Sequence, residues 1–88
     1  MSFSVRYDEK ALKQLKKMDR SVQRLIVNWI EKNLIDTENP RLHGKGLSGD
    51  KSGYWRYRVG DYRVIADIRD EEIIIVIVEI GNRREIYR

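Results

Sequence analysis

The spacing of apolar residues divides the first half of the chain into one strand and two helices. Residues 3–7, FSVRY, alternate between apolar and polar side chains, which predicts a strand. Asp8 is suited to cap a first helix that runs to about Met18, with lysines largely outside its apolar stripe. A second helix is predicted over residues 22–35, VQRLIVNWIEKNLI. Two helices joined so closely are expected to form an antiparallel hairpin.

The second half predicts a long loop and three strands. Residues 36–53 are rich in glycine and turn formers, and strands are expected at about 54–59, 62–68 and 72–80. The last of these, EIIIVIVEI, is apolar at nearly every position. Such a strand has both faces covered, so it belongs in the middle of a sheet.

These elements predict an α+β fold in the order β-α-α-β-β-β, as a single domain over residues 1–88. The two-helix hairpin packs on a small, twisted, mostly antiparallel sheet of four strands. The last strand lies between the first strand and the third, so the spatial order is first, fourth, third, second. The two helices cover one face, and the other is left to the C-terminal tail, to side-chain stems or to a partner protein.

The composition of the chain indicates its cellular location and the charge of its partners. The chain has no cysteine and a net charge of +4, so we expect a cytoplasmic protein with anionic partners. Its longest apolar run, IIIVIV, is too short to cross a bilayer, and no membrane association is expected. After Lys51, all the basic residues are arginines, which bind phosphate through a planar fork.

The stretch YWRYRVGDYR concentrates three arginines on a predicted hairpin. Gly60 and Asp61 form a two-residue turn signal, which places Arg58 opposite Arg63 and Arg56 on the same face. Like charges directly across a strand pair are destabilising. The arrangement therefore indicates an anion-binding site.

The remaining residue types favour RNA as the anion. The chain has one histidine and no cysteine, and no cluster of histidines and carboxylates, so neither a metal nor another cofactor is expected. RNA carries its own nucleophile, the 2′-hydroxyl, and guanidinium groups can align the phosphodiester and stabilise the charge of its transition state. DNA lacks that hydroxyl and would normally need water activated by a metal.

Nearly the whole chain resembles the RelE-type toxins of bacterial and archaeal toxin-antitoxin systems. The resemblance is carried by VRYDEKALKQLKKMD, by LSGDKSGYWRYRVGDYRVIADI and by the ending IVEIGNRREIYR. It implies a small twisted sheet backed by two helices. It also implies a type II toxin that cleaves messenger RNA in the ribosomal A site, leaving a 2′,3′-cyclic phosphate and inhibiting translation. A RelB-like antitoxin is the implied partner, in a hetero-oligomeric complex, besides the ribosome and messenger RNA.

The resemblance also assigns roles to individual residues. Arg56 and Arg58 match the basic pair on the first strand of the hairpin, and Arg63 matches the arginine that binds phosphate. Arg83 matches an arginine that helps to protonate the leaving oxygen or stabilises its charge, and Tyr87 matches a tyrosine that stacks on the substrate or orients it. The expected RNA-binding set comprises Arg56, Arg58, Arg63, Lys45, Lys51 and Arg84.

Several alternatives remain open at the level of sequence. The hairpin arginines could instead be partnered by Asp61, Asp67 and Glu79 on a solvated sheet face, and the basic tail could simply aid solubility. In function, the rivals are a ParE-like toxin that poisons DNA gyrase and a non-catalytic module that binds RNA or an antitoxin. Arginine is a poor general base, so the group that accepts the proton is not identified.

Overall fold

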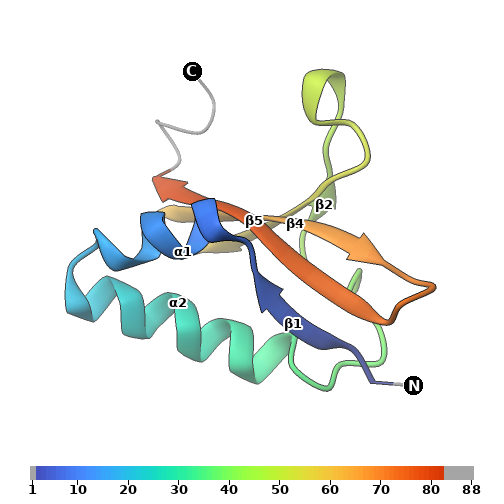
Figure 1. The fold of residues 1–88 in the computed structure, drawn as a ribbon, viewed down its shortest axis with the longest axis horizontal. Helices are drawn as coiled ribbons and strands as arrows, with labels where there is room; N and C mark the ends of the chain where they lie inside the picture. The colour runs from blue at the N-terminus through green and yellow to red at the C-terminus, as the bar shows by residue number, and fades with distance from the viewer. Residues whose placement is uncertain (1, 83–88) are drawn as a thin grey trace.

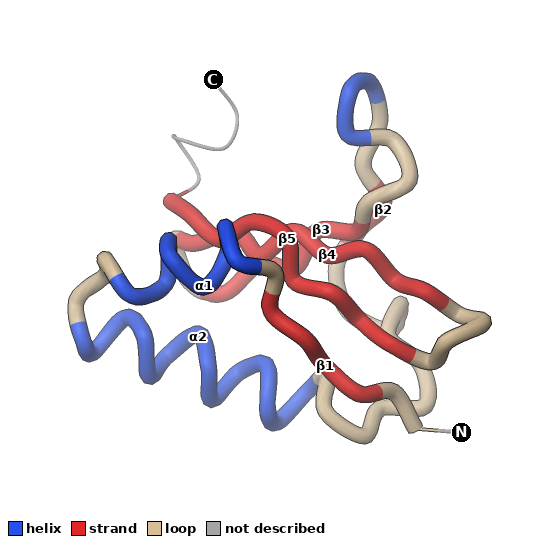
Figure 2. Tube along the Cα trace, in the orientation of Figure 1, coloured by secondary structure: helices blue, strands red, loops and turns tan. Residues whose placement is uncertain are grey.

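The computed structural model describes residues 2–82, which form two α-helices, a short 3-10 helix and five strands (Figures 1 and 2). In chain order, the elements are β1 (Ser4–Tyr7), α1 (Glu9–Lys16), α2 (Arg20–Asn33), β2 (Lys45–Gly46), η1 (Gly49–Lys51), β3 (Trp55–Val59), β4 (Tyr62–Arg69) and β5 (Ile74–Asn82). Among these residues, no helix is long and apolar enough to cross a membrane.

The strands form one mixed sheet in the order β1-β5-β4-β3-β2. β1 pairs with β5 in parallel, and the other pairings are antiparallel. This confirms the predicted α+β fold and the central position of the last strand. The predicted number of four strands is wrong, because β2 adds a fifth. β2 has only two residues, Lys45 and Gly46, so it has no hydrophobic period that the sequence could display.

Both helices lie on one side of the sheet, and residues 45–53, here called the arm, project from the other side (Figure 1). Asp8 caps α1 as predicted, because its side chain accepts a hydrogen bond from the Lys10 amide at 2.7 Å. The apolar stripes of the helices pack on the sheet, and the fully buried residues of this core include Ile26, Ile30 and Ile77.

Side chains of the long loop fasten it to the sheet before the arm begins. The Tyr57 hydroxyl donates a buried hydrogen bond to the Pro40 carbonyl at 2.6 Å, and burial raises the pKa of this tyrosine. Arg41 binds Asp70 through two hydrogen bonds, of 2.9 and 2.8 Å. A Cβ on Gly44 would overlap the carbonyl oxygen of its neighbour on β3, so only glycine fits this close approach. The start of the arm is therefore fixed against β3.

β5 is longer than its partner β1, and α1 covers the part that β1 does not reach. The pairing of β1 with β5 ends at Tyr7 and Ile77, whereas β5 continues to Asn82. Beyond that point, the Gln14 side chain of α1 accepts a hydrogen bond from the Ile80 amide at 2.8 Å. Because an exposed strand edge invites pairing with other chains, this contact protects the end of β5.

We predict that Gln14→Ala destabilises the protein by about 1–3 kcal/mol, because it leaves the buried Ile80 amide without its acceptor. Urea unfolding at neutral pH measures the change. Lys13→Ala is the control, since Lys13 lies exposed on the same helix and pairs with the exposed Glu9, four residues earlier. Equal stability of the wild type and Gln14→Ala would contradict the proposed role of Gln14.

Candidate functional site

The β3–β4 hairpin brings the predicted arginines onto one face of the sheet. Arg58 lies directly opposite Arg63, as expected, and Arg56 lies opposite Ile65. Side chains of cross-strand partners lie on the same face of a sheet. The side chains of all three arginines therefore leave the sheet on one face, the face opposite the helices. Gly60, the first residue of the turn between β3 and β4, has a positive φ of +60°, which glycine adopts readily.

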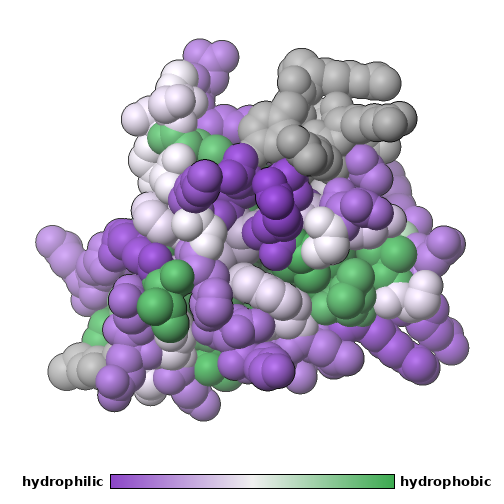
Figure 3. Space-filling view, turned by 180° about the vertical axis from the view of Figure 1, so that it is seen from behind, coloured by the Kyte–Doolittle hydropathy of each residue, from purple (hydrophilic) through white to green (hydrophobic). Residues whose placement is uncertain are grey.

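The arginines differ in exposure in a way that the sequence did not predict. Arg63 is only 2% exposed, Arg56 is half-buried and Arg58 is exposed. A buried guanidinium loses much of its rotational freedom, so Arg63 is suited to a fixed position, whereas Arg58 can adjust to a ligand. Figure 3 shows strongly hydrophilic residues gathered at the foot of the arm, on the rear of the view in Figure 1.

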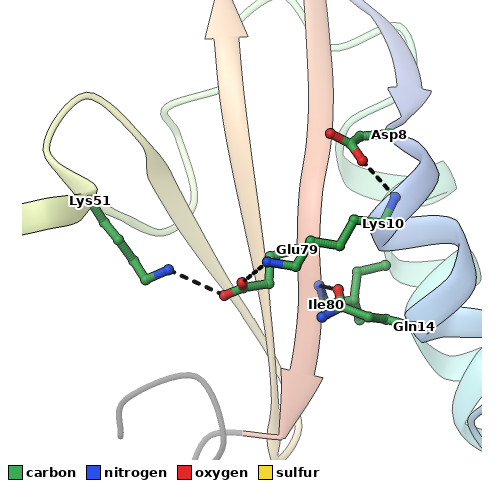
Figure 4. Close-up of polar contacts among 6 residues, drawn as sticks. All are labelled: Asp8, Lys10, Gln14, Lys51, Glu79 and Ile80. Carbon is green, nitrogen blue, oxygen red and sulfur yellow. Dashed lines mark hydrogen bonds and ion pairs between the residues drawn. The ribbon is translucent and has the colours of Figure 1, made fainter.

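A carboxylate, Glu79, lies on the same face as the arginines. It is opposite Ile65 on β4, and Arg63 is opposite Gly81, two residues further along β5. Lys10 of α1 donates a hydrogen bond to one oxygen of Glu79 at 2.8 Å, and Lys51 of the arm reaches the other at 3.4 Å (Figure 4). Glu79 thus connects the first helix, the central strand and the arm.

The charge state of Glu79 reflects this position. Its side chain is 15% exposed, and burial by itself raises the pKa of the carboxyl group. The hydrogen bond from Lys10, and then the charges of Lys10 and Lys51, outweigh burial and hold the pKa below its ordinary value. Glu79 is therefore ionised at neutral pH.

A cleft of about 510 Å³ opens beside Glu79, at the end of β5. Its ionisable lining residues among those described are Lys17, Lys51, Tyr62 and Glu79. Gln14 and Asn82 add polar groups. The cleft thus joins acidic, basic and hydrogen-bonding groups next to the arginine face, which suits an anionic ligand that also exchanges protons.

The remaining expected RNA-binding residues are only partly placed. Lys45 is exposed on β2, where it pairs with Arg56, and Lys51 lies in η1. Arg83, Arg84 and Tyr87 lie outside the described residues. Within residues 2–82, no group of three or more histidines and carboxylates is arranged to hold a metal ion.

Sequence patterns suggested Glu79 only as a counter-charge for the hairpin arginines. In the structure, Glu79 bridges Lys10 and Lys51, and Asp67 binds Arg69 at 3.0 Å. One signal was available, because Glu79 is the charged residue that interrupts an otherwise apolar central strand. Charged side chains are rarely buried without a partner, so such a residue indicates either an ion pair or a site.

Comparison with known proteins decides the family. Residues 5–87 match the family described as ParE toxin of type II toxin-antitoxin system, parDE. The chain belongs to this toxin family. Its curated relatives place it with the RelE-type toxins, which confirms the resemblance seen in the sequence. Toxin RelG of Mycobacterium tuberculosis is 30% identical over 88 residues, which covers 100% of this chain and 99% of RelG. The mRNA interferase toxin RelE of Escherichia coli K12 is 28% identical over 91 residues, covering 99% and 92%.

Solved structures of RelE toxins have the same fold as this RelE-type toxin. The toxin-antitoxin complex RelBE2 from Mycobacterium tuberculosis contains a chain with a TM-score of 0.84 and 26% identity, covering 94% of this toxin and 100% of that chain. The isolated Escherichia coli RelE toxin has a TM-score of 0.74 at 23% identity, covering 98% and 92%, and shows the same fold.

We predict that Glu79 makes the toxin's stability depend on pH. The pKa of Glu79 is lower in the folded protein than the ordinary value of 4.5, so its contribution is present above pH 4.5 and is lost as the pH falls through the folded value. Urea unfolding from neutral to acidic pH should show wild type more stable than Glu79→Gln at pH 7, with the difference shrinking on acidification.

Asp70→Asn provides the comparison for this experiment. The hydrogen bond from Arg41 also lowers the pKa of Asp70, but that pair is exposed, so solvent screening should leave a smaller pH-dependent effect. A difference between wild type and Glu79→Gln that stays constant from pH 7 to pH 3 would show that the charge of Glu79 does not stabilise the fold.

Proposed function

We propose that this RelE-type toxin is an endoribonuclease that cleaves messenger RNA in the ribosomal A site and so inhibits translation. The 2′-hydroxyl of the RNA attacks the adjacent phosphate without a metal ion. The observation that supports the proposal is the strand register that places Arg56, Arg58 and Arg63 on one sheet face, near a cleft lined by Glu79 and Lys51. The names of its relatives, which include mRNA interferase RelE of Escherichia coli, support the same activity.

In this proposal, the buried Arg63 fixes the scissile phosphate, and Arg56 and Arg58 stabilise the extra negative charge of the transition state. Lys45 and Lys51 hold the RNA backbone on the arm side, with Arg84 adding a contact. Arg83 and Tyr87 complete the site, as the family resemblance implies. Guanidinium groups that are already oriented need little rearrangement during the reaction. In this proposal, that benefit offsets the cost of placing two arginines opposite one another.

A RelB-like antitoxin is the proposed partner, in a hetero-oligomeric complex in the cytoplasm. Solved complexes of RelB and RelE proteins from Mycobacterium tuberculosis, Escherichia coli and Pyrococcus horikoshii have the fold of this toxin. The face opposite the helices carries both the arginine group and the arm, so an antitoxin that covers this face would also block RNA.

We predict that Arg58→Ala and Arg83→Ala each lower message cleavage by about 100-fold or more, because each removes a charge that the transition state needs. Induction in cells, followed by mapping of new 5′ ends in messenger RNA, measures cleavage. Arg69→Ala is the matched control, since Arg69 pairs with Asp67 and Glu72 at the other end of β4. Retained binding of the antitoxin shows that each variant is folded.

The outcome also separates the rival functions. Growth arrest with DNA damage and intact message would favour a toxin of DNA gyrase, and binding of RNA without new 5′ ends would favour a non-catalytic module. Full cleavage by both Arg58→Ala and Arg83→Ala would refute the assigned site.

A further inference from the structure

RNA cleavage by the 2′-hydroxyl requires a group that accepts a proton, and the arginines do not supply one. A guanidinium holds its proton at any pH at which proteins fold, so Arg56, Arg58 and Arg63 can bind and polarise the phosphate but cannot act as a base. The inference below rests on the proposed function and names the groups that move protons in that reaction.

Glu79 is placed to reach the phosphate that the arginines hold. It lies on the arginine face, diagonally across from Arg63, because Arg63 is opposite Gly81 two residues away. Diagonal neighbours on one face are roughly 7–8 Å apart at the backbone, within the combined reach of two long side chains and a bound phosphodiester. Glu79 is also the one carboxylate among the described residues that line the cleft.

Lys51 supplies a proton donor beside the Glu79 carboxylate. Its ammonium lies 3.4 Å from Glu79 and lines the same cleft, but it comes from the arm rather than from the strand. Lys10 holds the other oxygen of Glu79 from the opposite side, at 2.8 Å (Figure 4). An acid and a base thus lie side by side, on elements that approach the site from different directions.

We propose that Glu79 is the general base and Lys51 the general acid of RNA cleavage. The Glu79 carboxylate takes the proton of the 2′-hydroxyl while the 2′-oxygen forms its bond to phosphorus. The bond from phosphorus to the 5′-oxygen breaks, and that oxygen keeps the electron pair and takes a proton from Lys51. The products are a 2′,3′-cyclic phosphate and a 5′-hydroxyl. Glu79 is then protonated and Lys51 neutral, and transfer of the proton between these neighbours restores both groups.

Binding of RNA makes Glu79 a stronger base than it is in the free toxin. Burial raises its pKa, and the bonds from Lys10 and Lys51 lower it. A phosphate oxygen that binds either ammonium removes one of the bonds that lower the pKa and leaves burial in place. The pKa of Glu79 therefore rises towards the range in which a carboxylate is an effective base.

The first test compares Glu79→Gln with wild type in single-turnover cleavage of messenger RNA on programmed ribosomes. The amide keeps the size of the side chain but cannot take the proton, so cleavage should fall by about 100-fold or more with unchanged binding to the ribosome. Asp67→Asn is the matched control, because Asp67 is an ion-paired carboxylate on the same face of β4 and lies outside the cleft. It should cleave like wild type.

The second test separates catalysis by Lys51 from a structural role. In a message whose 5′-bridging oxygen is replaced by sulfur, the leaving thiolate needs no proton, because a thiol has a pKa of only about 8.5. At saturating toxin, where loss of the RNA contact of Lys51 does not limit the rate, Lys51→Ala should therefore cleave the normal message slowly and the sulfur-containing message at nearly the wild-type rate. Glu79→Gln should stay slow on both, since the 2′-hydroxyl still has to lose its proton.

Three results would overturn the assignment. Cleavage by Glu79→Gln within threefold of wild type would exclude Glu79 as the base, while the wild-type activity would leave the proposed function intact. An equal loss by Lys51→Ala on both messages would exclude Lys51 as the acid. A wild-type toxin that leaves message uncut would overturn the proposed function, and this inference with it.

Discussion

The short parallel pairing between β1 and β5 is the constraint on which the site depends. β1 stops after four residues, so the second half of β5 has a neighbouring strand, β4, on one side and helix α1 on the other. Gln14 and Lys10 of α1 therefore meet β5 where a strand would otherwise continue. A longer β1 would occupy this edge and leave no place for a lysine beside Glu79. Because β1 ends early, residues of α1 and of the turn that follows it line one side of the cleft.

The arm depends on contacts that precede it in the chain. Tyr57 binds the Pro40 carbonyl, Arg41 binds Asp70, and Gly44 lies tightly against the backbone of β3. These contacts fix where the arm begins, and the Lys51–Glu79 pair holds its far end over the sheet. The long, glycine-rich loop predicted from the sequence is therefore held in place by specific contacts, and it supports Lys51 beside Glu79.

The fold was largely predictable because its signals are local. Helical spacing identified the helices, and alternating positions or a continuous apolar run identified four strands. The turn at Gly60 and Asp61 gave the correct register of Arg58 and Arg63. The role of Glu79 was not predictable, because its partners Lys10 and Lys51 are 69 and 28 residues away in the sequence. The burial of Arg63 likewise depends on tertiary packing, since the same alternation is compatible with an exposed side chain. Contacts between segments that are far apart in the chain produce no periodic spacing of apolar residues, so sequence patterns do not reveal them.

The bridge from Lys10 through Glu79 to Lys51 also bears on selectivity. A polyanion that approaches Lys51 has to displace a carboxylate of the toxin's own chain before it can bind there. Under the proposed function, an RNA strand that also binds the hairpin arginines gains more from this displacement than a nucleic acid that contacts Lys51 alone. Glu79 would then compete with weakly bound nucleic acids for Lys51.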